Sequence, residues 1–213
     1  MIPTRQRLLD AIRAAAVETP LGALTPAGIA RRAETHRVTF YRFWPDMQAA
    51  IIEAFAAEVD RLVTAQDESV AGVTDVAALA EVYDGIMESS LAEVLARRQI
   101  YSTLFEWPAF RTHVHEVLRQ RAQTMVDTLG AAGVRVAGAE SGTAAVFVAG
   151  ASLSVFAAWA ADDRQDVSAR AREIVDQMPA WWPRANPEKE GDPRRSADPQ
   201  GWAPSGSNRR PTD

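Results

Sequence analysis

The sequence predicts an all-α fold, with a three-helix unit at the N-terminus and a larger helical unit after it. Ala-rich segments carry apolar residues at helical spacing along most of the 213 residues, and little strand-like alternation is visible. The hydrophobic fraction of 47% is enough for a sizeable core. Charge divides the chain as well. Residues 1–45 carry 7 Arg or Lys against 3 Asp or Glu, whereas residues 46–182 carry 10 against 20.

Three short helices are expected in the N-terminal unit. Residues 4–18 place apolar side chains on one side and arginines on the other, which predicts an amphipathic helix. After a break that contains Pro and Gly, Thr25 and Pro26 predict the start of a second helix. Threonine can cap free amides, and proline is tolerated at the first helical position. This helix is expected to end near residue 33, and a third helix follows over residues 36–43.

The larger unit is predicted to contain only helices. Asp46 is expected to cap a long helix that ends near residue 65. Further helices are predicted over residues 74–97, 98–106, 109–131, 138–162 and 167–178. Residues 183–213 are rich in Pro, Gly, Ser and charge, with too little apolar surface to offset the cost of ordering, which predicts a disordered tail. The expected parts are therefore 1–45, 46–182 and 183–213.

The spacing of the second and third helices is that of a helix-turn-helix unit. In such a unit the third helix enters the major groove of DNA, and the helix before it lies against the backbone. Phe40, Phe43 and Trp44 have the spacing to pack inward, whereas Arg37 can offer a two-pronged donor to guanine. The predicted contacts to bases and phosphates are Thr25, Thr35, His36, Arg37, Thr39, Tyr41 and Arg42.

The motifs "LLDA", "GIARRA", "TFY" and "WP" follow one another without a gap between Leu8 and Phe55. This stretch of about 48 residues resembles the DNA-binding domain of the tetracycline-repressor (TetR) family of bacterial transcriptional regulators. Two departures stand out. Glu34, Thr35 and His36 replace the usual Gly-Val-Ser of the turn, which removes a residue free to adopt positive φ. Met47 replaces a lysine that often touches phosphate in relatives.

The resemblance implies that the larger unit is a ligand-binding and dimerisation domain. Apolar side chains with a few polar groups are typical of small-ligand pockets, although ordinary core residues have the same helical spacing. The candidate ligand contacts are Tyr83, Met87, Tyr101, Leu104, Phe105, Trp107, Phe110, His113, Phe147 and Trp159. Residues 141–163 are apolar nearly all round, and with residues 169–182 they resemble the helix pair that joins two subunits in this family. A buried helix within a monomer is the alternative.

Several classes of site and location are disfavoured. Zero cysteines exclude disulfides and thiolate metal sites, and they suit a reducing cytoplasm. His113 and His115 fall on different faces of a helix, so no metal site is expected. No cofactor or catalytic motif is present. The N-terminus lacks the pattern of a signal peptide, and residues 143–161 reach the length of a membrane span but are expected to form a buried helix.

The leading functional prediction is a cytoplasmic, homodimeric transcriptional regulator. It is expected to act as a repressor that a small-molecule effector releases from double-stranded operator DNA, with no cofactor and no membrane. The alternative is a helical ligand-binding or interaction protein with weakened or lost DNA binding, motivated by the altered turn and Met47. An enzyme is a third class, and the absence of catalytic motifs disfavours it.

Overall fold

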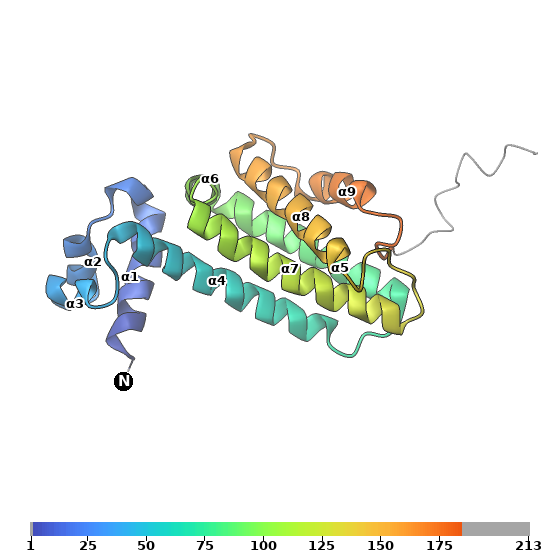
Figure 1. Ribbon diagram of the computed structural model, residues 1–213. Coiled ribbons are helices and arrows are strands. Elements are labelled where there is room, and N and C mark those ends of the chain that lie inside the picture. The colour runs from blue at the N-terminus through green and yellow to red at the C-terminus, as the bar shows by residue number, and fades with distance from the viewer. Residues whose placement is uncertain (1, 185–213) are drawn as a thin grey trace, which may run out of the picture.

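The computed structural model describes residues 2–184, and all regular structure in that range is helical (Figure 1). The all-α prediction is therefore confirmed. The elements are α1 (Thr4–Glu18), a 3-10 turn η1 (Leu21–Ala23), α2 (Pro26–Arg32), α3 (Arg37–Tyr41), α4 (Met47–Val70), α5 (Val76–Ala96), α6 (Arg98–Leu104), α7 (Pro108–Ala131), α8 (Thr143–Ala161) and α9 (Val167–Gln177). Helices α1 to α3 form a small head, and α5 to α9 pack with most of α4 into a larger body (Figure 1).

The head is built around a compact apolar centre. Leu8 and Ile12 of α1 are fully buried, as is Phe40 of α3. Trp44 follows α3 and is 4% exposed, and its indole Nε1 donates a hydrogen bond of 2.8 Å to Glu53 of α4. The sequence therefore places large side chains inward from each short helix. Their burial holds together helices that are too short to be stable alone.

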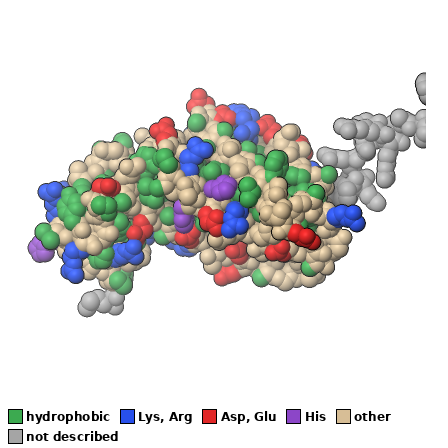
Figure 2. All heavy atoms as spheres, in the orientation of Figure 1, with side chains coloured by type: hydrophobic (Ala, Val, Ile, Leu, Met, Phe, Trp, Pro, Cys, Tyr) green, Lys and Arg blue, Asp and Glu red, His purple; other side chains and the backbone are tan. Residues whose placement is uncertain are grey.

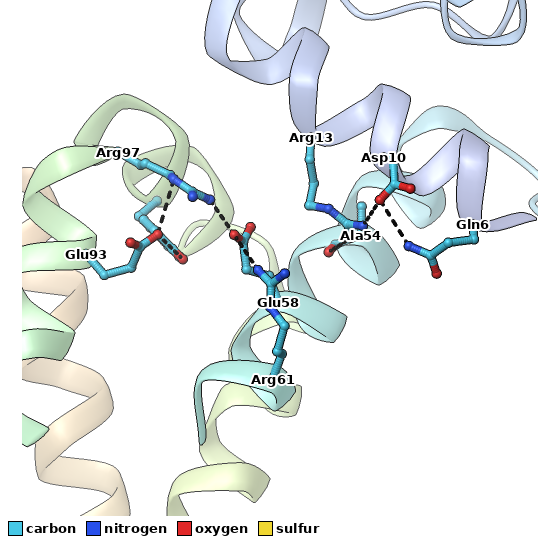
Figure 3. Close-up of polar contacts among 9 residues, drawn as sticks. Gln6, Asp10, Arg13, Ala54, Glu58, Arg61, Glu93 and Arg97 are labelled. Atoms are coloured by element: carbon cyan, nitrogen blue, oxygen red, sulfur yellow. Dashed lines mark hydrogen bonds and ion pairs between the residues drawn. The ribbon is translucent and has the colours of Figure 1, made fainter. Parts of the chain in front are cut away.

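Helix α4 is shared between the head and the body. Arg13 of α1 donates a hydrogen bond of 3.0 Å to the carbonyl oxygen of Ala54 (Figure 3). One turn further along α4, the buried carboxylate of Glu58 accepts a hydrogen bond of 2.6 Å from Arg97, which stands between α5 and α6 (Figure 3). The two connections lie on neighbouring turns of one helix, so α4 contacts both the head and the body.

Helix α8 is the most apolar element of the body, and it packs against α5, α6 and α7. Within residues 2–184 it is the one helix long and apolar enough to cross a membrane by length and composition, with a mean hydropathy of 1.9. Half of this helix's most apolar 18-residue stretch is buried inside the fold. Trp159 is fully buried and donates a hydrogen bond of 3.0 Å to the carbonyl of Leu91 in α5. This packing agrees with the prediction of a buried helix.

Several helix boundaries differ from those predicted, and the differences in α4, α8 and α3 affect the packing. Helix α4 continues to Val70 instead of ending near residue 65. Helix α8 begins at Thr143 instead of 138, because Gly138 and Gly142 adopt positive φ angles of 78° and 71° and form turns there. Helix α3 ends at Tyr41, two residues earlier than predicted.

The early end of α3 overturns one packing prediction. Phe43 lies in the turn after α3 and is 40% exposed, so its predicted inward orientation is wrong. Helical spacing no longer applies beyond the end of the helix. The predicted tail, 183–213, lies outside the described residues except for Pro183 and Arg184. Arg184 donates a hydrogen bond of 3.1 Å to the carbonyl of Met178.

Candidate functional site

The turn between α2 and α3 sets the direction of the candidate recognition helix. Glu34 adopts a left-handed φ of 50°. This conformation is uncommon for residues other than glycine, and the turn contains no glycine. The Glu34 amide donates to the carbonyl of Arg31 at 3.1 Å, and the Thr35 amide donates to that of Ala30 at 2.9 Å. This pair of bonds is a Schellman motif. The turn therefore forms with a non-glycine residue, at a cost of about 1 kcal/mol.

The predicted DNA contacts share the surface of the head. His36, Arg37, Tyr41 and Arg42 are exposed, whereas Thr35 and Thr39 are half-buried. Arginine side chains gather on the head, and acidic side chains are more frequent over the body (Figure 2). We refer to His36, Arg37, Thr39, Tyr41 and Arg42 as the α3 face.

Thr25 stands apart from the α3 face, at the start of α2. Its hydroxyl accepts a hydrogen bond of 3.2 Å from the amide of Gly28, as its predicted capping role requires. The hydroxyl is exposed, so it remains accessible to a phosphate. One of the amides of the helix N-terminus is already satisfied by this bond.

Arg37 and Tyr41 form a pair on the α3 face. The Nη2 atom of Arg37 donates a hydrogen bond of 3.1 Å to the Tyr41 hydroxyl, and its guanidinium lies 5.4 Å from the centre of the tyrosine ring. These residues are one turn apart, which is the spacing at which helical side chains meet. The pair orients Arg37 and leaves its other N–H groups free to donate.

Two exposed apolar side chains beside the α3 face were not predicted. Val38 is 75% exposed and Phe43 is 40% exposed. Apolar side chains in such positions can contact the methyl group of thymine. Val38 lies between Arg37 and Thr39, which were both predicted to face outward. Its place in the sequence therefore indicated that its side chain is exposed as well.

The body contains a partly open cavity of about 470 Å³ between α4, α5, α6, α7 and α8. Its lining is mainly apolar, and its volume is in the range of small-ligand pockets. Five of the ten predicted ligand contacts line it: Tyr83, Met87, Tyr101, Phe105 and Phe110. They come from α5, α6 and α7, so the fold brings together side chains that are up to 27 residues apart in the sequence.

The other five predicted contacts lie outside this cavity. Leu104 and Trp159 are fully buried in the core, where they contribute to packing. Trp107 stands at the start of α7. The Nε2 atom of His113 lies 2.9 Å from a carboxylate oxygen of Asp60 in α4, and Phe147 is 61% exposed on the outer side of α8. Aromatic character alone did not distinguish cavity residues from core or surface residues.

A polar group in the cavity lining was missed at the sequence level. Gln66 of α4 donates hydrogen bonds of 3.2 and 3.3 Å to the hydroxyls of Ser89 and Ser90, and its side-chain oxygen accepts one from Arg121 of α7. All four residues line the cavity. Arg121 falls in the series 114, 118, 121, 125 of α7, where the other members are apolar. A charge at a buried position of a helix was the available signal.

Two tyrosine hydroxyls also line the cavity. Burial raises the pKa of Tyr83 to about 12, and burial together with Glu93 raises the pKa of Tyr101 further still. Both phenols are therefore neutral at physiological pH and can donate a hydrogen bond. Within residues 2–184, no three His, Cys, Asp or Glu side chains are grouped so as to hold a metal ion.

No family model matches this chain, and no curated protein matches it in sequence. Several solved structures share its fold, among them two FadR regulators and RolR. A fatty acid degradation regulator, FadR from Bacillus halodurans, is 18% identical with a TM-score of 0.58, over 82% of this chain and 93% of its own. RolR, solved without ligand, is 19% identical with a TM-score of 0.61, over 79% of this chain and 89% of its own.

The third is the transcriptional regulator FadR from Bacillus subtilis, solved in complex with stearoyl-CoA. It is 12% identical with a TM-score of 0.57, over 83% of this chain and 98% of its own. At such identities the similarity establishes the fold. The chain therefore has the helical architecture of these regulators, with a helix-turn-helix head followed by a larger helical body.

Proposed function

We propose that the protein is a ligand-responsive DNA-binding transcriptional regulator of the TetR type, acting in the cytoplasm as a homodimeric repressor. The observation that carries this proposal is the α3 face, an exposed set of basic and aromatic side chains on a recognition helix with an intact turn before it. The shared fold with solved regulators supports it.

The alternative of a protein that has lost DNA binding is less well supported. It was motivated by the altered turn and by Met47. The turn keeps its hydrogen bonds with Glu34 in the left-handed conformation, so the recognition helix is still presented outward. Met47 is half-buried at the start of α4, beside the head. Methionine carries no positive charge, so its presence in place of lysine removes at most one phosphate contact from each subunit.

The effector is proposed to be an apolar small molecule that binds in the cavity. Helix α4 supplies Val59, Leu62, Val63 and Gln66 to the cavity lining, and its first half holds the head through Glu53 and Ala54. A ligand that shifts α4 therefore moves the head of its own subunit. The coupling free energy between ligand and DNA equals the difference between the ligand's binding free energies for the released and the DNA-bound arrangements.

The proposed dimer forms through α8 and α9. Helix α8 contains no charged residue, and on its outer side Val146 is 50% exposed and Phe147 is 61% exposed. Large exposed apolar side chains next to small ones are typical of protein interfaces. Two heads are needed because a dimeric helix-turn-helix protein reads two half-sites one helical turn apart.

Replacing Phe147 by aspartate should convert the dimer into a monomer. A buried aromatic at the centre of an interface contributes about 2 kcal/mol or more, and the new carboxylate would lose its hydration there. Size-exclusion chromatography with light scattering measures the mass directly. Val17→Asp is the matched control, because Val17 is 75% exposed on α1, and this variant should stay dimeric. A dimeric Phe147→Asp protein would contradict the proposed interface.

DNA binding is tested by a gel shift with the DNA upstream of the protein's own coding region. A specific complex should form at low salt, and its affinity should fall linearly on a plot of log affinity against log salt. Unlabelled DNA of the same sequence should compete better than unrelated DNA. Absence of any complex at low salt would contradict the proposal and favour the ligand-binding alternative.

A further inference from the structure

The cavity lining contains a buried cation with unused hydrogen-bond donors. The side chain of Arg121 is only 9% exposed. Its Nη1 atom donates to Gln66, whereas Nε and Nη2 are buried and have no hydrogen-bond acceptor among residues 2–184. Burial lowers the pKa of Arg121, since the charged form loses hydration, yet a guanidinium stays protonated in proteins. Buried donors of this kind normally have a partner.

A second unused donor lies in the same lining. Trp182 is 6% exposed, and its indole Nε1 also lacks an acceptor within the described part of the chain. The Trp182 ring lies 5.7 Å from the ring of Tyr83, and the charge of Arg121 acts on the Tyr83 hydroxyl. All three side chains line the cavity, with Trp182 packed against Tyr83 and the charge of Arg121 acting on the same tyrosine.

The acidic residues nearby do not satisfy these donors. Asp67 lies 3.6 Å from Arg121 Nε, which is too long for a hydrogen bond, and its side chain is 59% exposed to solvent. Glu93 lines the cavity, but it is paired with Arg97 at 3.2 Å. Every unpartnered buried side-chain atom found in the lining belongs to Arg121 or Trp182, and each is a donor.

We infer that the cavity binds an apolar molecule that carries a carboxylate, whose oxygens accept hydrogen bonds from Arg121 and Trp182. A carboxylate accepts from several donors at once and matches the planar guanidinium. The remainder of the lining along α7 is apolar, through Phe110, Val114 and Leu118. Phe110 and Arg121 are eleven residues apart on one helix, a span of ~16 Å, which leaves room for an extended apolar body. The inference rests on the ligand-binding function proposed above.

The test compares acids with alcohols of the same shape. Dodecanoate, kept below its critical micelle concentration, and 1-dodecanol, kept below its solubility limit, form one pair for calorimetric titration. The second pair is 2-naphthoate and 2-naphthylmethanol. The first pair tests an aliphatic source of the carboxylate and the second an aromatic one. We expect the acid of at least one pair to bind about 10-fold more tightly than its alcohol.

Arg121→Met keeps the size of the side chain and removes its charge. It should abolish the preference for the acid while the alcohol binds within about 2-fold of its affinity for the unaltered protein. Arg119→Met is the matched control, because Arg119 lies on the same helix, pairs with Glu116 and does not line the cavity. It should retain the preference for the acid.

Equal binding of acid and alcohol in both pairs, or binding of none of the four compounds, would overturn the inference. A preference that survives Arg121→Met would overturn it as well. The gel shift is run on the same preparations. A complex with DNA but no preference for an acid overturns only this inference, whereas a preference for the acid without DNA binding supports it and refutes the regulatory function.

Discussion

Replacing Arg37 by alanine should weaken operator binding by about 1–3 kcal/mol for each half-site and relax the base preference at the contacted position. Arg37 is exposed at the start of α3, where a recognition helix contacts base edges. Its guanidinium is oriented by the Tyr41 hydroxyl at 3.1 Å. In the proposed dimer the residue occurs twice, so both half-sites would lose the contact and the total effect would be correspondingly large.

Fluorescence anisotropy with the operator, at one fixed salt concentration, measures this loss. Selection of sites from a randomised library then measures the change in base preference. Arg135→Ala is the matched control. It removes the same charge from an exposed site between α7 and α8, on the body, and should leave affinity nearly unchanged. Unaltered operator affinity after Arg37→Ala would show that the α3 face does not read DNA in this way.

The pair of Arg37 and Tyr41 refines this prediction. From the sequence, Tyr41→Phe is expected to weaken a phosphate contact without changing base preference. In the structure the Tyr41 hydroxyl holds the guanidinium, so Tyr41→Phe should also loosen Arg37 and broaden the preference. A double-mutant cycle should therefore give a coupling of about 0.5 kcal/mol or more between them. Additive losses would mean that the two side chains act independently on DNA.

The head could be predicted closely because its signals are local. Thr25 and Pro26 define the start of α2 through capping chemistry, and the residues that follow fix the rest by their helical spacing. Phe43 shows where this reasoning fails. The end of α3 depends on how the chain turns toward α4, and a two-residue difference at a helix end reverses the direction of a side chain.

The cavity was predicted less well because its lining depends on packing between distant helices. Trp159 and Tyr83 were both predicted to contact the ligand, yet only Tyr83 borders the cavity. The end of α4 was missed for a related reason. Gln66 lies just beyond the predicted end near residue 65, whereas in the structure it belongs to α4 and is held between α5 and α7 by Ser89, Ser90 and Arg121. Tertiary contacts override local polarity there.

Replacing Arg97 by methionine should lower the free energy of unfolding by about 3 kcal/mol. Glu58 is 4% exposed, and its Oε1 atom accepts hydrogen bonds from Arg97 at 2.6 Å and from Arg61 at 3.2 Å (Figure 3). Loss of one partner leaves a buried carboxylate poorly compensated, which costs more than the pair itself contributes. Urea denaturation measures the change as a lower midpoint at an unchanged slope.

Two further variants separate charge burial from simple loss of contacts. Arg61→Met removes the other partner, but that side chain is 70% exposed, so its loss should cost less than about 1 kcal/mol. Combining Glu58→Met with Arg97→Met removes the buried charge together with its partner and should recover most of the stability. Equal costs for Arg61→Met and Arg97→Met, or no recovery in the double variant, would contradict this account.

Because Arg97 also holds Glu93 at the cavity wall, the destabilised variant should bind ligands there more weakly, and the double variant should not regain that affinity.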